Sequence, residues 1–243
     1  MVNDAHAHMG FFPRLNAEEA FHYSPRRIFG ALDRAGVGEF VVSSTDAVWD
    51  ADGSAMHAAA LEMKRLAGRR AHVFFWVSGA HLERNPDLEL PDCYEGFKLH
   101  GGETAWLKRP KELERVLSVA RERRFPVTIH TGLDGDGADA YLPFCLKFPQ
   151  VKFDLAHGRP FGAVPEVMRR APNVFTDTAF VAPEQVRAWI DSGADASRIL
   201  FGTDVPAQLR YRKIGLTPLL RRLIAEIPLP EIADENFFRF LSR

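Results

Sequence analysis

Short apolar segments alternate with longer amphipathic segments along most of the chain. The short segments are rich in the β-branched and aromatic residues typical of strands. In the longer segments apolar residues recur every three to four positions, as on one face of a helix. Strands are expected at residues 1–8, 39–43, 71–77, 95–100, 126–130, 151–156, 173–178 and 198–201. Helices are expected at residues 25–35, 54–66, 111–123, 138–147, 164–170 and 183–192, with further helical segments in 214–241.

Eight strands, each followed by a helical segment, predict an α/β fold of the (β/α)8 TIM barrel type. We expect a single domain that spans residues 1–243. An open, doubly wound sheet is the alternative, and it would place a glycine-rich phosphate-binding turn after the first strand. That strand ends in histidines instead, which favours the barrel.

Residues 9–23 are expected to form a loop after the first strand. The segment contains Phe11, Phe12 and Phe21. Long loops beside a barrel mouth often close over a ligand. The loop is therefore either a lid or a segment packed against the rim.

The amino-acid composition narrows the classes of partner that the protein is expected to bind. Hydrophobic residues make up 46% of the chain, which supplies a large core, and the formal net charge is −1. Proteins that bind nucleic acids usually carry a basic surplus, so we expect none as a partner. No apolar run approaches the roughly 20 residues needed to span a bilayer, and the first residues lack the basic and apolar regions of a signal peptide. We expect a cytoplasmic protein whose partner is a small-molecule substrate.

Five of the nine histidines lie at or directly after the ends of predicted strands, and one aspartate follows the eighth strand. They are His6, His8, His100, His130, His157 and, just after the eighth strand, Asp204. The carboxyl ends of barrel strands all face one mouth, where active sites form. Side chains that are far apart in sequence are therefore expected to converge.

His6 and His8 are two positions apart in one strand, so both side chains point to the same face, and Ala7 points toward the helices. Two neighbouring imidazoles can bind one metal ion. A third imidazole and a carboxylate complete a set typical of zinc or a similar divalent ion.

In order and spacing, these segments resemble the amidohydrolase superfamily. The resemblance is to metal-dependent barrel hydrolases, a group that includes decarboxylases related to aminocarboxymuconate semialdehyde decarboxylase. It covers essentially the whole chain, and Asn236 with Phe237–Phe238 resembles the closing helix of the family. The matching segments are DAHAH (4–8), GFKLH (96–100), TIHTG (128–132), LAHG (155–158) and ILFGTD (199–204).

The resemblance implies that His6, His8, His130 and Asp204 bind the metal. Asp204 would also take a proton from the attacking water and pass it to the leaving group. His157 would act beside the metal, either as a ligand of a second ion or as a catalytic residue that contacts the water or the substrate.

Lys98 and His100 lie on one face of the fourth strand. In binuclear relatives a carboxylated lysine on this strand bridges two metals, while the nearer relatives bind one, and we favour one. Lys98 would otherwise orient the substrate or pair with a carboxylate, because a buried lysine without a partner is costly. His100 either lines the pocket or takes part in catalysis.

Further residues at the expected mouth are candidates for supporting roles. Arg159 is a candidate anchor for an anionic substrate, since guanidinium pairs with carboxylate through two hydrogen bonds; a surface ion pair is the alternative. Asp177 either orients a metal-binding histidine or occupies a turn. Trp106, with Trp49 and Trp76, either lines an apolar substrate pocket or packs in the core.

The expected activity is metal-dependent hydrolysis of a small C–N, C–O or lactone bond. The alternative is non-oxidative decarboxylation at the same mononuclear site. Zinc is the favoured metal because the ligands are rich in histidine, with manganese or iron as alternatives. The Phe237–Phe238 segment is a candidate contact surface for a homo-oligomer.

Overall fold

Across the residues that the structure describes, nine strands form one curled sheet. The computed structural model describes residues 1–16, 19–50, 52–132, 136–212 and 214–242 (for 13–16 and 19–21, the backbone alone). The strands are β1 (Val2–Asn16), β2 (Glu19–Tyr23), β3 (Val37–Ser44), β4 (Ala71–Trp76), β5 (Gly96–His100), β6 (Val127–His130), β7 (Phe153–Ala156), β8 (Val174–Asp177) and β9 (Ile199–Leu200).

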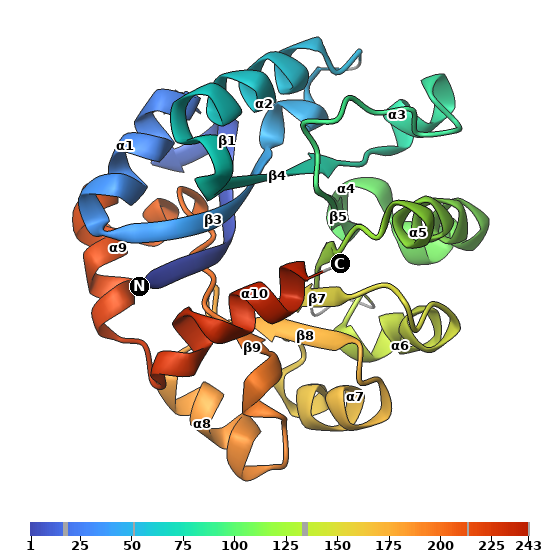
Figure 1. The fold of residues 1–243 in the computed structure, drawn as a ribbon, viewed down its shortest axis with the longest axis vertical. Helices are drawn as coiled ribbons and strands as arrows, with labels where there is room; N and C mark the ends of the chain where they lie inside the picture. The colour runs from blue at the N-terminus through green and yellow to red at the C-terminus, as the bar shows by residue number, and fades with distance from the viewer. Residues whose placement is uncertain (17–18, 51, 133–135, 213, 243) are drawn as a thin grey trace.

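Helices lie around the curled sheet and across one of its ends (Figure 1). They are α1 (Pro25–Ala35), α2 (Ser54–Ala67), α3 (Gly79–Arg84), α4 (Gly101–Thr104), α5 (Pro110–Arg123), α6 (Ala138–Lys147), α7 (Val164–Arg170), α8 (Pro183–Asp191), α9 (Leu216–Ala225) and α10 (Glu235–Leu241). None of these helices is both long and apolar enough to cross a membrane.

The first helix shows how local sequence sets the boundaries. Ser24 accepts a hydrogen bond from the backbone N–H of Arg27, and Pro25 occupies the first turn, where its missing N–H costs nothing. Gly36 ends the helix with φ of 82°, a left-handed conformation that glycine adopts without strain. The boundaries expected for this helix are confirmed.

Parallel pairing runs through the sheet from β1 to β9 in the order β1-β3-β4-β5-β6-β7-β8-β9, and only β2 pairs antiparallel. The segment after β9 returns to β1. The N–H of Ala5 donates to the carbonyl of Phe201 (2.8 Å), and that of His8 donates to Val205 (2.7 Å). These bonds place the segment containing Asp204 beside the strand containing His6 and His8.

Apolar packing forms two layers. The larger core lies between the strands and the outer helices and includes Ala7. A smaller cluster lies within the curl of the sheet, and α10 contributes Phe237 and Phe240 to it. Figure 1 shows α10 lying across this end of the sheet, where β1 begins. The histidines lie at the opposite end, where the strands have their carboxyl ends.

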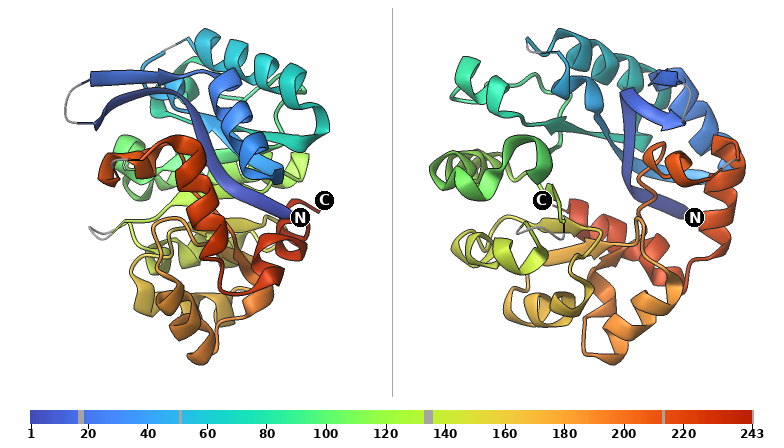
Figure 2. Two further views of the ribbon diagram at one scale, coloured as in Figure 1. Left: turned by 90° about the vertical axis from the view of Figure 1, so that its left-hand side faces the viewer. Right: turned by 180° about the vertical axis from the view of Figure 1, so that it is seen from behind.

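Two expectations need correction. The segment expected as a loop is a β-hairpin: β1 continues to Asn16 and pairs with β2, and the two strands project from the body of the protein (Figure 2). Phe11 and Phe12 lie in it, while the side chain of Phe21 is outside the described residues. In the Phe237–Phe238 segment Phe237 is buried against the sheet, so only Phe238, 45% exposed, can contact a partner.

Candidate metal centre

His6 and His8 point to the same side of β1. Their Nε2 atoms lie 3.1 Å apart, while Ala7 packs into the helix-side core. Both histidines are buried. The alternation of side chains along a strand therefore brings two imidazole nitrogens to one point, as the spacing predicted.

Asp204 completes this group from the other end of the chain. Its Oδ1 lies 3.0 Å from Nε2 of His8 and 3.9 Å from Nε2 of His6. Its backbone N–H donates to the carbonyl of His6 (2.6 Å), so the strand that carries two of the candidate ligands also positions the third. Asp204 adopts a left-handed φ of 49°, which is uncommon outside glycine and typical of functional sites.

At Gly202 the backbone passes close to the side chains of His6 and Asp177, and this close approach makes the arrangement possible. A Cβ atom at that position would lie 3.0 Å from the Cβ atoms of both His6 and Asp177. Any larger residue would push the closing segment away from β1.

Asp177 and Ser43 fix the two imidazole rings. Oδ2 of Asp177 lies 2.6 Å from Nδ1 of His6, and Oγ of Ser43 lies 2.9 Å from Nδ1 of His8. An ionised carboxylate only accepts, so Nδ1 of His6 carries the proton and its Nε2 offers a lone pair. The geometry supports the orienting role expected for Asp177.

The donor atoms of His6, His8 and Asp204 fit a divalent metal ion. With bonds of about 2.0–2.1 Å, ligand atoms are about 2.9 Å apart in an octahedron and about 3.3 Å apart in a tetrahedron. The observed separations are 3.0, 3.1 and 3.9 Å. Two of the three separations match these values, and the three residues form a candidate group for one metal ion.

Lys98 supplies positive charge beside this group. It is 2% exposed, and its Nζ lies 2.9 Å from Nε2 of His6. Burial lowers its pKa, whereas Asp204, Asp177 and Asp154 favour the charged form. The lysine thus has electrostatic partners, as the cost of burying an ammonium group requires.

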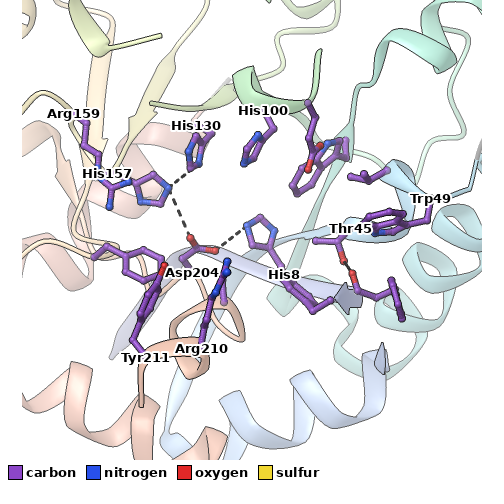
Figure 3. A pocket seen from close by; sticks show the side chains of 17 residues that line it. His8, Thr45, Trp49, His100, His130, His157, Arg159, Asp204, Arg210 and Tyr211 are labelled. Carbon is purple, nitrogen blue, oxygen red and sulfur yellow. Dashed lines mark hydrogen bonds and ion pairs between the residues drawn. The ribbon is translucent and has the colours of Figure 1, made fainter. Parts of the chain in front are cut away.

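His157 and His130 extend the cluster on the other side of Asp204. Nε2 of His157 lies 3.8 Å from Oδ2 of Asp204 and 3.0 Å from Nδ1 of His130 (Figure 3). Asp177 accepts from the backbone N–H of His157, whose φ of 70° is also left-handed. In the described part of the chain, the close donor groups are His6–His8–Asp204 and His6–His157–Asp177, and neither includes His130.

A stack of three rings continues the wall beyond His130. His100 lies face to face with His130, with ring centroids 4.0 Å apart, and with Trp76 at 5.7 Å. Burial and the neighbouring Lys98 lower the pKa of His100 to about 3. His100 is therefore an uncharged member of the cavity wall.

Burial and the charges of neighbouring groups also shift the pKa of the candidate metal ligands. Burial disfavours the charged form of Asp204, but His6 and His8 outweigh it and hold the pKa of this carboxyl well below its ordinary value. Burial and Lys98 lower the pKa of His6. Asp204 is therefore present as a carboxylate and His6 as a neutral imidazole, the protonation states that bind a metal.

A cavity of about 610 Å³ opens above the cluster, within the size range of small-molecule sites. Arg159 lies beside His157, Arg210 and Tyr211 lie beside Asp204, and Trp49 lies beyond His8 (Figure 3). Phe11, Phe12, Trp76 and Phe180 add apolar wall. Trp106 is fully buried and does not line this cavity.

Several residues at the site escaped the sequence analysis. Ser43 and Asp4 lie in strands and could have been found there. Asp4 accepts a hydrogen bond from the hydroxyl of Thr203 (2.6 Å) and so anchors the Asp204 segment. Glu103 and Arg210 lie in short helices, where sequence patterns say little about direction.

The sequence matches the family described as Amidohydrolase over residues 3–237. No curated protein matches it. Among solved structures, an amidohydrolase from Burkholderia multivorans with bound zinc is similar, with a TM-score of 0.68 and 15% identity. That match covers 100% of this chain and 99% of the other.

Two further structures carry names for different reactions. A probable 2-pyrone-4,6-dicarboxylic acid hydrolase from Acinetobacter baumannii has a TM-score of 0.61 and 13% identity, covering 100% of this chain and 99% of that one. A 5-carboxyvanillate decarboxylase from Novosphingobium aromaticivorans, complexed with manganese, has a TM-score of 0.59 and 13% identity, covering 89% and 80%. At these identities the likeness concerns the fold.

Proposed function

Because the chain belongs to the amidohydrolase family, we propose that it is a metal-dependent hydrolase of a small C–N, C–O or lactone bond. The convergence of His6, His8 and Asp204 carries this proposal, since their donor atoms are spaced for one divalent ion. The bonds from β1 to residues 201–205 support a closed (β/α)8 barrel with the site at its mouth.

The metal would supply two effects. A bound divalent ion lowers the pKa of water from about 15.7 toward about 7 and polarises a carbonyl group. Asp204 would then take a proton from the attacking water, since its oxygens lie 3.0 Å from Nε2 of His8 and 3.8 Å from Nε2 of His157. Zinc suits the imidazole ligands, and manganese or iron would also fit them.

The fourth ligand is either His130 or His157. The resemblance to the family assigns His130, whereas by distance His157 lies nearer to Asp204, with His130 behind it. Metal analysis of His130→Ala and His157→Ala distinguishes them. The variant that loses the ion identifies the ligand, and the other residue contacts the substrate or the water.

The cavity favours a substrate with an anionic group. In the part of the chain that the structure describes, no carboxylate lies within ion-pair distance of Arg159 or Arg210. Free guanidinium groups beside aromatic walls suit a carboxylate on a compact substrate. The same feature favours the second candidate, decarboxylation, in which a carboxylate is lost as CO2.

Metal analysis tests the proposal most directly. Purified protein should contain about one divalent ion per chain by elemental analysis. His6→Ala combined with His8→Ala should abolish binding while the circular dichroism spectrum is retained. A metal-free protein that gains no activity with zinc or manganese would contradict the proposal. Release of CO2 from aromatic carboxylates, compared with cleavage of lactones and amides, then decides between the two reactions.

A further inference from the structure

Lys98, Thr128 and Asp154 form a polar row inside the curl of the sheet. They occupy paired positions on the neighbouring strands β5, β6 and β7. Paired residues of adjacent strands point to the same face, and the contact of Lys98 with His6 shows that this face is the interior. All three side chains are buried, with exposed fractions of 2% or less. An ammonium group and a carboxyl group therefore lie in one buried row, with a single threonine between them.

Asp154 is a buried acceptor without a donor. Among the residues that the structure describes, neither of its side-chain oxygens has a hydrogen-bond partner, and the hydroxyl of Thr128 lacks one as well. Buried polar groups are normally hydrogen-bonded, and a carboxyl group without a partner is costly to bury. Burial and the nearby Asp177 raise the pKa of Asp154 well above its ordinary value, whereas Lys98 lowers it. An ammonium group placed against these oxygens would satisfy them.

Lys98 contacts a nitrogen atom that the metal ion also needs. Its Nζ lies 2.9 Å from Nε2 of His6. Because Asp177 holds a proton on Nδ1 of this ring, Nε2 carries the one lone pair available for bonding. That lone pair either accepts a hydrogen bond from Lys98 or binds the ion, and two positive charges this close also repel each other. Metal binding therefore displaces Lys98 from His6.

Three aspartates attract the ammonium group of Lys98, and they differ in what else they bind. The three are Asp204, Asp177 and Asp154. Asp204 would bind the ion, and Asp177 uses one oxygen for the ring of His6 and the other for two backbone N–H groups. Asp154 has both oxygens free. Adjacent strands are about 4.8 Å apart, so the Cα atoms of Lys98 and Asp154 are about 10 Å apart, which the two side chains together can bridge.

We propose that Lys98 has two positions and that Asp154, together with Thr128, forms the second. Nζ of Lys98 contacts His6 when no ion is bound, and it moves to Asp154 when the ion takes the lone pair of His6. Asp154 is then a positioning residue that raises the affinity for metal without contacting the metal. The inference rests on the metal site of the function proposed above.

Two crystal structures of the wild-type protein test the movement directly, one after treatment with a chelator and one with zinc. Nζ of Lys98 should lie within hydrogen-bond distance of Nε2 of His6 in the first structure and of the carboxyl group of Asp154 in the second. Anomalous scattering shows whether zinc is bound. A zinc-bound structure in which Nζ stays at His6, binds the ion or carries a carboxylate group would overturn the proposal.

A double-mutant cycle measures the same effect in solution through competition for zinc with a chelator. Asp154→Asn should weaken zinc binding about 10- to 100-fold, because Lys98 then keeps its position at His6. Lys98→Met should bind zinc at least as tightly as the wild type. In that background, which has no ammonium group to move, Asp154→Asn should change the affinity less than about threefold. Lys147→Met, on the outer helix α6 where the lysine pairs with Glu114, is the control and should leave the affinity unchanged.

The outcomes separate this inference from the proposed function. Equal weakening by Asp154→Asn in both backgrounds would show that Asp154 acts through packing rather than through Lys98. Loss of zinc from folded Lys98→Met would make the lysine a support of the ion rather than its competitor. Either result overturns the two-position lysine while zinc binding by the wild type stands. If a single variant does not fold, the two wild-type structures decide. A wild-type protein that binds no zinc contradicts the proposed metal site and this inference with it.

Discussion

Asp177 joins the two histidines that flank Asp204. One of its oxygens contacts Nδ1 of His6, and the other accepts the backbone N–H groups of His157 and Ala179. The residue is fully buried. A single carboxylate thus sets the tautomer of one ring and the backbone position of the other.

Replacing Asp177 with asparagine should weaken metal binding about 10- to 100-fold. The amide can donate to Nδ1 of His6, which moves the ring proton to Nε2 and removes the lone pair that binds metal. Competition with a chelator measures the affinity. Asp191→Asn, exposed at the end of α8, is the matched control, and an unchanged affinity in Asp177→Asn would show that His6 does not need this partner.

Sequence predicts residues of the site where side-chain direction follows from strand geometry. His6, His8 and Asp177 lie in strands, and their direction follows from alternation. The choice between His130 and His157 depends on small differences in distance that no sequence pattern encodes. Glu103 and Arg210 lie in short helical turns whose orientation is set by packing, so the sequence pointed to neither.

At the scale of elements, a histidine clamp ties neighbouring strands together at the end away from the mouth. His72 of β4 lies 2.9 Å from Glu39 of β3 and 2.7 Å from Glu95, just before β5. Lys64 of α2 also pairs with Glu95. Burial alone would lower the pKa of His72, but Glu95 and Glu39 outweigh it and raise this pKa.

The clamp should stabilise the fold over a defined range of pH. Stability from His72 is complete below its ordinary pKa of about 6.5 and is lost as pH rises through the raised folded value. The pKa of Glu95 is lowered to about 2, so its contribution to stability changes with pH in the opposite direction. Its contribution is present above the ordinary value of about 4.3 and is lost as pH falls toward 2.

His72→Gln should therefore reduce the free energy of unfolding by roughly 1–2 kcal/mol at pH 6 and by less at pH 9. Urea denaturation at the two pH values measures this. His22→Gln, an exposed histidine in the hairpin, is the control and should show a smaller effect at pH 6. Equal losses at both pH values would mean that His72 acts through packing rather than charge.

Helices and parallel strands were predictable because their repeats are strong, and the expected helix at residues 25–35 coincides with α1. The hairpin was missed because residues 9–23 were expected to form a loop. The antiparallel pairing of β1 with β2 is a contact between two strands, and the sequence pattern within a single strand does not show it.

Across the whole molecule, packing and chemistry occupy opposite ends of the sheet. Phe237 and Phe240 of α10 cover one end, and the cavity opens at the other. Because Phe237 and Phe240 are buried in apolar packing, we expect this end of the sheet to serve stability.

Phe237→Ala should accordingly destabilise the protein by about 3–5 kcal/mol and leave the metal content of the folded protein unchanged. Phe238→Ala is the matched control, since that neighbour is 45% exposed and should cost far less. Thermal or urea unfolding and elemental analysis are the two measurements. A loss of metal from folded Phe237→Ala would show that the ends of the sheet are coupled.

The hydrogen bond from the N–H of Asp204 to the carbonyl of His6 has a consequence for biosynthesis. His6 and His8 leave the ribosome before their carboxylate partner, which follows nearly two hundred residues later. Such distant contacts form late, because the intervening chain must first be ordered. We expect the nascent chain to acquire its ion only after the closing segment docks on β1, so that metal loading marks the completion of folding.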